Sequence, residues 1–158
     1  MFSELPGPLR FEVLFQLTRE LLEKAPLFKY CSAPLRNTLL DALILQTYPP
    51  EVLIAQEGEF GNEIFFVSRG TLEVVTREGT TSHAIFEEGD YFGELSLLMK
   101  ESRTASVKTL SYCEIFILKA ADFNRIKDDY PEFKEVVKKM SAEKTEKTMA
   151  LVMEGLIL

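Results

Sequence analysis

Apolar residues recur every three to four positions over the first part of the chain, from Leu9 to about Tyr48. The runs with this spacing are Leu14, Leu17 and Leu21, then Leu35, Leu39 and Leu43. Such a period places the apolar side chains on one face of an α-helix. Ser32 and Pro34 suit a helix start, and Pro49-Pro50 ends the pattern because proline cannot continue a helix. We therefore expect leading helices over residues 1–48.

The middle of the chain, residues 49–119, has a different pattern, in which short apolar runs alternate with turn residues. Three such runs are Ile64–Val67, Leu72–Val75 and Ile115–Leu118. Six of the eight glycines lie between Gly58 and Gly93, where they separate these runs. Short strands with regularly spaced glycine turns are typical of antiparallel rolls and sandwiches. We expect an antiparallel, jelly-roll-like β-roll over residues 49–119.

The last part of the chain, residues 120–158, returns to helical spacing, and Pro131 divides it into two helices. On the second helix, steps of four and three residues join Phe133, Val137, Met140, Lys144, Lys147 and Leu151. These positions trace one helix face, which begins apolar and is then interrupted by two lysines. Leading helices, a roll and two closing helices predict a single α+β domain.

Charge and composition narrow the possible functions. The formal net charge of −7 argues against a nucleic-acid partner, because binding a phosphate backbone requires a basic face. The two cysteines, Cys31 and Cys113, are far apart and form no disulfide framework or metal motif, which favours a reducing cytosolic setting. We find no apolar stretch near the ~20 residues that cross a bilayer and no signal-peptide pattern. A soluble piece of chain is expected.

The segment from Tyr91 to Val107 carries the clearest chemistry. Gly93 lets an anion approach the main chain closely, because glycine has no Cβ. Residues 94–98 read as one short helical turn, whose unpaired N–H groups favour negative charge. Arg103 adds a cation that can grip phosphate oxygens with two hydrogen bonds. Glu94 is a poor neighbour for phosphate but a good acceptor for a sugar hydroxyl, so the segment predicts an anionic, sugar-bearing ligand.

This segment, with Gly93-Glu94 followed by Arg103-Thr104-Ala105, resembles the phosphate-binding cassette (residues 91–107) of the cyclic nucleotide-binding domain family. Residues 54–75 and 111–133 resemble the strands and helix that flank this cassette. The resemblance implies that Arg103 and the main-chain amides at Leu95 and Ser96 hold the phosphate of cAMP or cGMP, and that Glu94 binds the ribose 2′-hydroxyl. It implies a binding domain without catalytic residues, metal or further cofactor.

The resemblance also assigns residues to the base. It implies that Thr104 contacts guanine in the syn conformer, and that Lys144 and Lys147 reach the nucleotide when the last helix closes. The roll positions that pack on the purine are matched by Val74, Ala84 and Phe86. Ordinary structural roles stay open for these residues: a β-branched Thr104 suits a strand, apolar strand residues form cores, and lysines populate solvated helix ends.

Residues 5–13 and 25–32 resemble the linker helices that precede this domain in cyclic-nucleotide-gated and hyperpolarisation-activated ion channels. This likeness implies the cytoplasmic domain of a membrane protein, with the linker and pore domain of a homotetrameric channel as its partners. Closure of the last helix over the ligand would then move the linker helices and regulate the pore.

Three alternatives remain at this point. A transcription regulator of the catabolite-activator type shares the fold but needs a helix-turn-helix module, which these 158 residues do not contain. A cupin-like metal enzyme is disfavoured because His83 is the only histidine. A kinase regulatory subunit normally carries two cassettes, and one is present.

Overall fold

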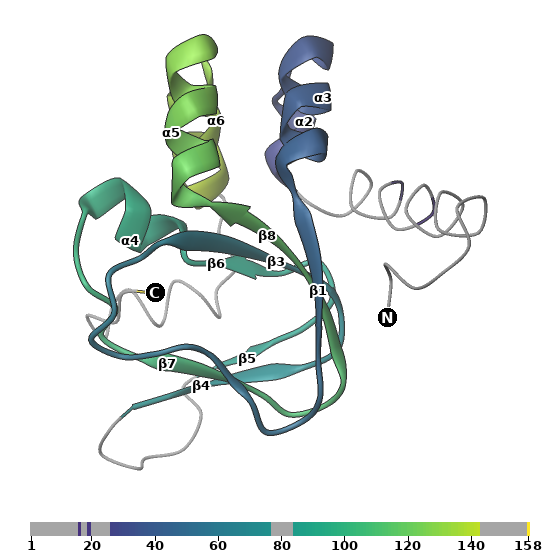
Figure 1. Cartoon of the computed structure of the whole chain (residues 1–158), viewed down its shortest axis with the longest axis vertical. Helices are drawn as coiled ribbons and strands as arrows, with labels where there is room; N and C mark the ends of the chain where they lie inside the picture. Colours follow the sequence, from purple (N-terminus) through teal and green to yellow (C-terminus); the bar gives the residue numbers. More distant parts are fainter. Residues whose placement is uncertain (1–15, 17–18, 20–25, 77–83, 143–157) are drawn as a thin grey trace.

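Two antiparallel sheets of four strands each form the body of the structure (Figure 1). This computed structural model describes residues 16, 19, 26–76, 84–142 and 158. The strand order is β1-β8-β3-β6 in the first sheet and β2-β7-β4-β5 in the second. The bounds are β1 Ile44–Tyr48, β2 Leu53–Ala55, β3 Glu63–Arg69, β4 Leu72–Val75, β5 Ile85–Phe86, β6 Tyr91–Phe92, β7 Ser106–Thr109 and β8 Cys113–Lys119. All of these strands pair antiparallel, which confirms the predicted roll.

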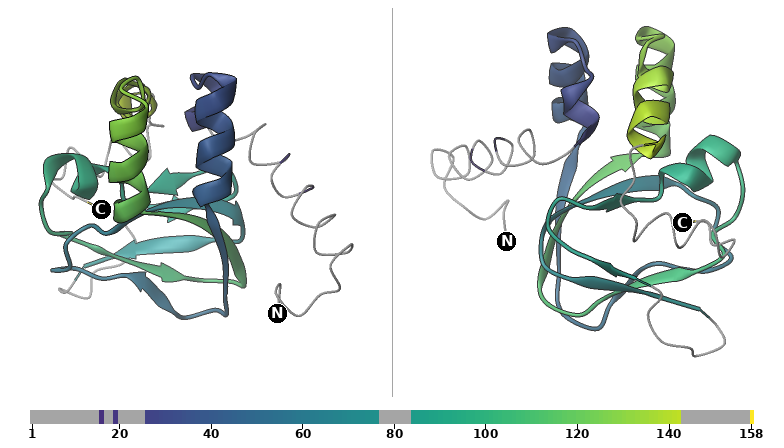
Figure 2. Two further views of the ribbon diagram at one scale, coloured as in Figure 1. Left: turned by 45° about the horizontal axis from the view of Figure 1, so that its top comes forward. Right: turned by 180° about the vertical axis from the view of Figure 1, so that it is seen from behind.

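Helices from both ends of the described chain gather at one end of the roll (Figures 1 and 2). They are α2 Pro26–Lys29, α3 Ala33–Ala42, α5 Ala120–Asp129 and α6 Phe133–Ala142. A further short helix, α4 Glu94–Met99, follows β6 inside the roll sequence. The order of helices, strands and helices confirms the α+β class, and Pro131 lies between α5 and α6 as predicted.

Helix α3 begins as the sequence predicts but ends earlier. The Ser32 side chain accepts a hydrogen bond from the Leu35 N–H at 3.4 Å, and a proline stands in the first turn. The prediction that the helical pattern extends to about Tyr48 was wrong. Leu43 is already extended, and residues 44–48 form β1, which pairs along its whole length with β8. This strand contains β-branched and aromatic residues that suit a sheet, and the ladder satisfies its main-chain groups.

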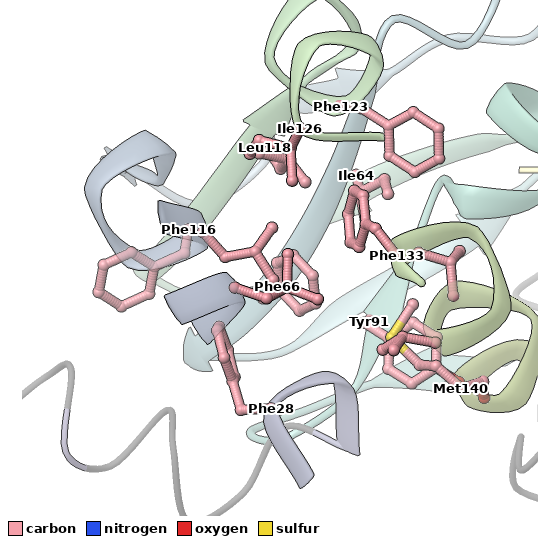
Figure 3. Packing of buried hydrophobic residues seen from close by; sticks show 14 residues of the cluster. Phe28, Ile64, Phe66, Tyr91, Phe116, Leu118, Phe123, Ile126, Phe133 and Met140 are labelled. Carbon is pink, nitrogen blue, oxygen red and sulfur yellow. Dashed lines mark hydrogen bonds between the residues drawn. The ribbon is translucent and has the colours of Figure 1, made fainter. Parts of the chain in front are cut away.

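Strand β3 supplies both hydrophobic cores because successive side chains point to opposite faces of a strand. Ile64 and Phe66 belong to a cluster between the first sheet and the helices, whereas Phe65 and Val67 belong to a second cluster between the two sheets. Figure 3 shows the first cluster, in which α6 contributes Phe133 and Met140. In the second cluster the rings of Phe65, Phe92 and Phe86 stack in sequence, each 4.9 Å from the next.

The last described helix, α6, packs on the roll through the face that its sequence predicts. Phe133, Val137 and Met140 are fully buried, which confirms the apolar beginning of that face. The rest of the predicted face, with Lys144, Lys147 and Leu151, lies outside the described residues. Tyr91 of β6 lies beside Met140 (Figure 3), and its hydroxyl donates a hydrogen bond to the Met140 main-chain oxygen. This bond joins α6 to the strand that leads into α4.

Replacing Tyr91 by phenylalanine should remove this bond and keep the packing. We expect the free energy of unfolding to fall by about 0.5–1.5 kcal/mol, measured by urea denaturation. Burial, and then the negative charges of Glu94 and Asp90, raise the pKa of Tyr91 above its ordinary value. The stabilisation by a neutral Tyr91 is therefore complete below the ordinary tyrosine pKa of about 10 and is lost as pH rises further.

The difference in stability between the wild type and Tyr91→Phe should therefore be constant below about pH 10 and should narrow above it. A difference that is absent at neutral pH would show that this hydrogen bond does not hold α6. A difference that persists unchanged above pH 10 would contradict the raised pKa.

Candidate functional site

The chain turns sharply at Gly93, between β6 and α4. Its φ of +99° lies in the left-handed region, where glycine is favoured. A Cβ at this position would lie only 2.5 Å from the main-chain oxygen of Glu63 and 3.5 Å from Nη2 of Arg103. Gly93 therefore brings the start of α4 against β3 and beside the Arg103 guanidinium. The predicted approach of an anion to this glycine stays a prediction.

Arg103 is a buried cation, with 3% of its surface exposed. Its Nη2 donates to the Glu63 main-chain oxygen at 3.1 Å, and its guanidinium carbon lies 5.5 Å from the centre of the Phe65 ring. The Nε atom is buried and makes no hydrogen bond within the described part of the chain. Burial lowers the pKa of Arg103, while Glu63 and Glu59 oppose that shift. A buried cation with donor capacity to spare can bind an anion strongly.

The loop between β2 and β3 positions Arg103, and sequence reasoning missed this role. The main-chain N–H of Arg103 donates to the Glu59 oxygen, and the Gly58 N–H donates to the Arg103 oxygen, both at 2.7 Å. Gly61 lies so close to α4 that a Cβ there would meet the Ser96 Cβ at 2.2 Å. The closely spaced Gly58 and Gly61 were the available sequence signal for a loop packed against other backbone.

Glu94 and Ser96 lie in the first turn of α4 and are buried, with exposures of 0% and 2%. The Glu94 carboxyl stands at the positive end of the helix, where an acid is favoured. Leu95 between them is half-buried. The Ser96 hydroxyl makes no hydrogen bond to any other described residue. Gly93 has no side chain to cap this turn, so acceptors for its N–H groups must come from elsewhere in the chain or from a ligand.

The three roll residues predicted to pack on the purine lie on or directly beside strands of the second sheet and belong to the same interior cluster. Val74 and Phe86 are fully buried, and Ala84 packs partly buried against the same cluster. The Val74 N–H donates to the Ala84 oxygen at 3.1 Å, which pairs the two segments. Ala105 joins this cluster directly after Arg103 and a half-buried Thr104.

The structure thus brings the anion-binding and apolar candidates to one region of the roll. Gly93 and Arg103 lie side by side, and Ala105 continues from Arg103 into the cluster that contains Val74 and Phe86. Lys144 and Lys147 lie outside the described residues, so their predicted role stays a prediction. Leu158 also lies in this cluster, and no sequence pattern indicated it.

The described residues contain neither a cluster of metal ligands nor a membrane-spanning helix. They contain no group of three or more histidine, cysteine, aspartate or glutamate side chains that would hold a metal ion. None of the helices in the described ranges is both long enough and apolar enough to cross a membrane.

Comparison with known proteins identifies the family. Residues 45–130 match the model of the cyclic nucleotide-binding domain, and this stretch is more than half of the chain. The chain therefore belongs to the cyclic nucleotide-binding domain family, the family that the segment from Tyr91 to Val107 resembles.

Several curated relatives are ion channels. The chain is 31% identical over 149 residues to cyclic nucleotide-gated channel alpha-4 of Mus musculus, covering 90% of this chain and 26% of the relative. It is 31% identical over 163 aligned positions to cyclic nucleotide-gated channel alpha-2 of Homo sapiens, covering 99% of this chain and 24% of the relative. It is 32% identical over 131 residues to potassium/sodium hyperpolarization-activated cyclic nucleotide-gated channel 2 of Mus musculus, covering 83% of this chain and 15% of the relative. The chain thus spans about a quarter or less of these relatives.

Substituting Gly93 by alanine tests whether the site geometry depends on this turn. The variant places a Cβ against the Glu63 oxygen and also strains the left-handed backbone. Gly89→Ala is the matched control, because Gly89 has a φ of +92° in a turn. We expect Gly93→Ala to lower the free energy of unfolding by about 1–3 kcal/mol more than Gly89→Ala, because the Cβ at position 93 also overlaps the Glu63 oxygen. If thermal denaturation shows equal losses of stability for the two variants, the fold does not depend on the close approach of Gly93 to Glu63.

Proposed function

We propose that this chain binds cAMP or cGMP inside the roll, without hydrolysing it, and that binding regulates an ion channel of which the chain forms a cytoplasmic domain. The observation that carries the binding proposal is the buried Arg103 beside the Gly93 turn. The membership of the family and the channel names of the relatives support the rest.

In this proposal the cyclic phosphate lies between Arg103 and the first turn of α4. The guanidinium supplies the charge that a phosphate requires, and its buried Nε is available as a donor. The amides at Leu95 and Ser96 supply neutral donors from the main chain. Glu94 accepts a hydrogen bond from the ribose 2′-hydroxyl, since it stands one residue after Gly93 and is buried beside the same turn.

The base would lie against the apolar interior formed by Val74, Ala84 and Phe86. These side chains offer apolar contacts for a purine but no polar group that distinguishes adenine from guanine. Thr104 is the candidate for that distinction, because its hydroxyl can accept from the 2-amino group that guanine has and adenine lacks. We therefore propose that both nucleotides bind, with Thr104 favouring cGMP.

Coupling to a channel would run from α6 to the leading helices, which already share one core. Phe28 of α2 belongs to the same cluster as Phe133 and Met140. A hydrogen bond of 3.0 Å joins Thr38 of α3 to the Tyr130 hydroxyl just before α6. Movement of α6 on ligand binding would therefore displace α2 and α3, provided that the ligand has a higher affinity for the closed arrangement.

In this view Lys144 and Lys147 close over the nucleotide as the last helix moves. The linker and pore domain of a homotetrameric channel would be the partners that receive the displacement. The chain itself would act by binding alone, which agrees with a sequence that offers no evident nucleophile-base pair.

Arg103→Ala should weaken the binding of both cyclic nucleotides by about 2–5 kcal/mol, because the phosphate loses its buried cation. Titration calorimetry would measure this loss. The variant should stay folded, since it loses one hydrogen bond but also relieves a buried charge. Arg125→Ala is the control, because Arg125 is an exposed arginine paired with Asp122 at 2.9 Å. Unchanged affinity in a folded Arg103→Ala protein would refute the phosphate assignment.

Thr104→Ala should lower the affinity for cGMP by about 0.5–1.5 kcal/mol, the value of one neutral hydrogen bond. Affinity for cAMP should stay nearly constant and serves as the internal control. Competition of both nucleotides against one fluorescent cyclic nucleotide would measure the two effects together. Equal losses for the two ligands would indicate that Thr104 shapes the strand and does not read the base.

A further inference from the structure

Leu158 occupies the region that the proposed function assigns to the nucleotide. Its main-chain oxygen accepts a hydrogen bond of 3.0 Å from the Ser96 N–H. Its side chain is 6% exposed and packs in the cluster between the two sheets, with Phe65, Val74, Phe86, Phe92 and Ala105 among its members. A residue that is distant in sequence therefore touches both the first turn of α4 and the apolar interior.

Each of these two contacts coincides with one made by the proposed ligand. The Ser96 amide is one of the donors proposed for the cyclic phosphate, and a donor N–H that points at Leu158 cannot be fully available to an anion. Val74 and Phe86 are the side chains proposed to pack on the purine, and they already share a cluster with the Leu158 side chain. Leu158 thus combines a polar acceptor and an apolar group in the arrangement that a nucleotide would present.

The geometry of α4 explains why such an internal acceptor is favourable. Because Gly93 offers no capping side chain, the Ser96 N–H has to find its acceptor outside the helix. A buried N–H without an acceptor is costly. Either the ligand or Leu158 can satisfy it, and both of them exclude water from the apolar interior.

We propose that Leu158 is an internal competitor of the cyclic nucleotide, so that the ligand must displace it to bind. This inference rests on the proposed function. The apparent association constant for the nucleotide is then the intrinsic one multiplied by the fraction of molecules in which Leu158 has left the site. Any event that holds Leu158 away would sensitise the protein to cyclic nucleotide without changing a single residue that contacts the ligand.

Leu158→Ala tests the competition, because it removes the apolar anchor and leaves the main-chain oxygen. Leu53→Ala is the matched control, since Leu53 lies on β2 and is 45% exposed. Titration calorimetry with cAMP should show an affinity on the order of tenfold higher for Leu158→Ala than for the wild type. Leu53→Ala should bind like the wild type, and circular dichroism should confirm that all three proteins are folded.

Amide hydrogen exchange at Ser96, without nucleotide, supplies a readout that does not depend on binding. The wild type should protect this amide, and Leu158→Ala should exchange it several-fold faster, whereas Leu53→Ala should not. Equal protection of Ser96 in all three proteins would overturn the contact itself. If the wild type and Leu158→Ala bind cAMP equally well, the competition is wrong while the proposed function stands. If neither binds cAMP or cGMP, the proposed function fails and the competition fails with it, even when the Ser96 amide shows that Leu158 is seated.

Discussion

The close contact between the Gly93 turn and the Glu63 main-chain oxygen is the constraint on which the rest of the site depends. A left-handed residue without a side chain lets α4 start directly against the beginning of β3. The same Glu63 oxygen accepts the hydrogen bond from Arg103. One carbonyl therefore fixes the distance between the amide end of α4 and the buried guanidinium, and a side chain at position 93 would separate them.

Hydrogen bonds from the main chain also hold the buried cation of the site in place. Two hydrogen bonds from the loop between β2 and β3 hold the backbone of Arg103, and its ring contact with Phe65 orients the guanidinium. The aromatic stack that begins with Phe65 continues through Phe92 to Phe86. The cation and the apolar interior are thus parts of one packed unit, which is a geometry suited to an anion attached to a flat base. It also explains how one internal residue, Leu158, can fit both halves at once.

Local patterns predicted much of the fold and of the candidate site. The cap at Ser32, the break at Pro131 and the short strands separated by glycine turns depend on neighbours in sequence, and the Gly93-Glu94 pair with Arg103 fits within one short segment. Strand β1 was not predicted, because its pairing with β8 joins residues about seventy positions apart and overrides the helical spacing that reaches Leu43. The role of the loop around Gly58 in positioning Arg103 and the buried position of Leu158 were not predicted for the same reason, since both depend on contacts that only the folded chain creates. The roles of Lys144 and Lys147 stay predictions.

The most direct test of the central claim is a two-dimensional NMR titration of the 15N-labelled chain with cAMP. We expect the largest shifts at the main-chain amides of Gly93, Glu94, Leu95 and Ser96, together with the Nε–H of Arg103, at nucleotide concentrations that saturate a single site. A nucleotide that saturates a site but leaves these five signals in place, while shifting amides in another part of the roll, would contradict it.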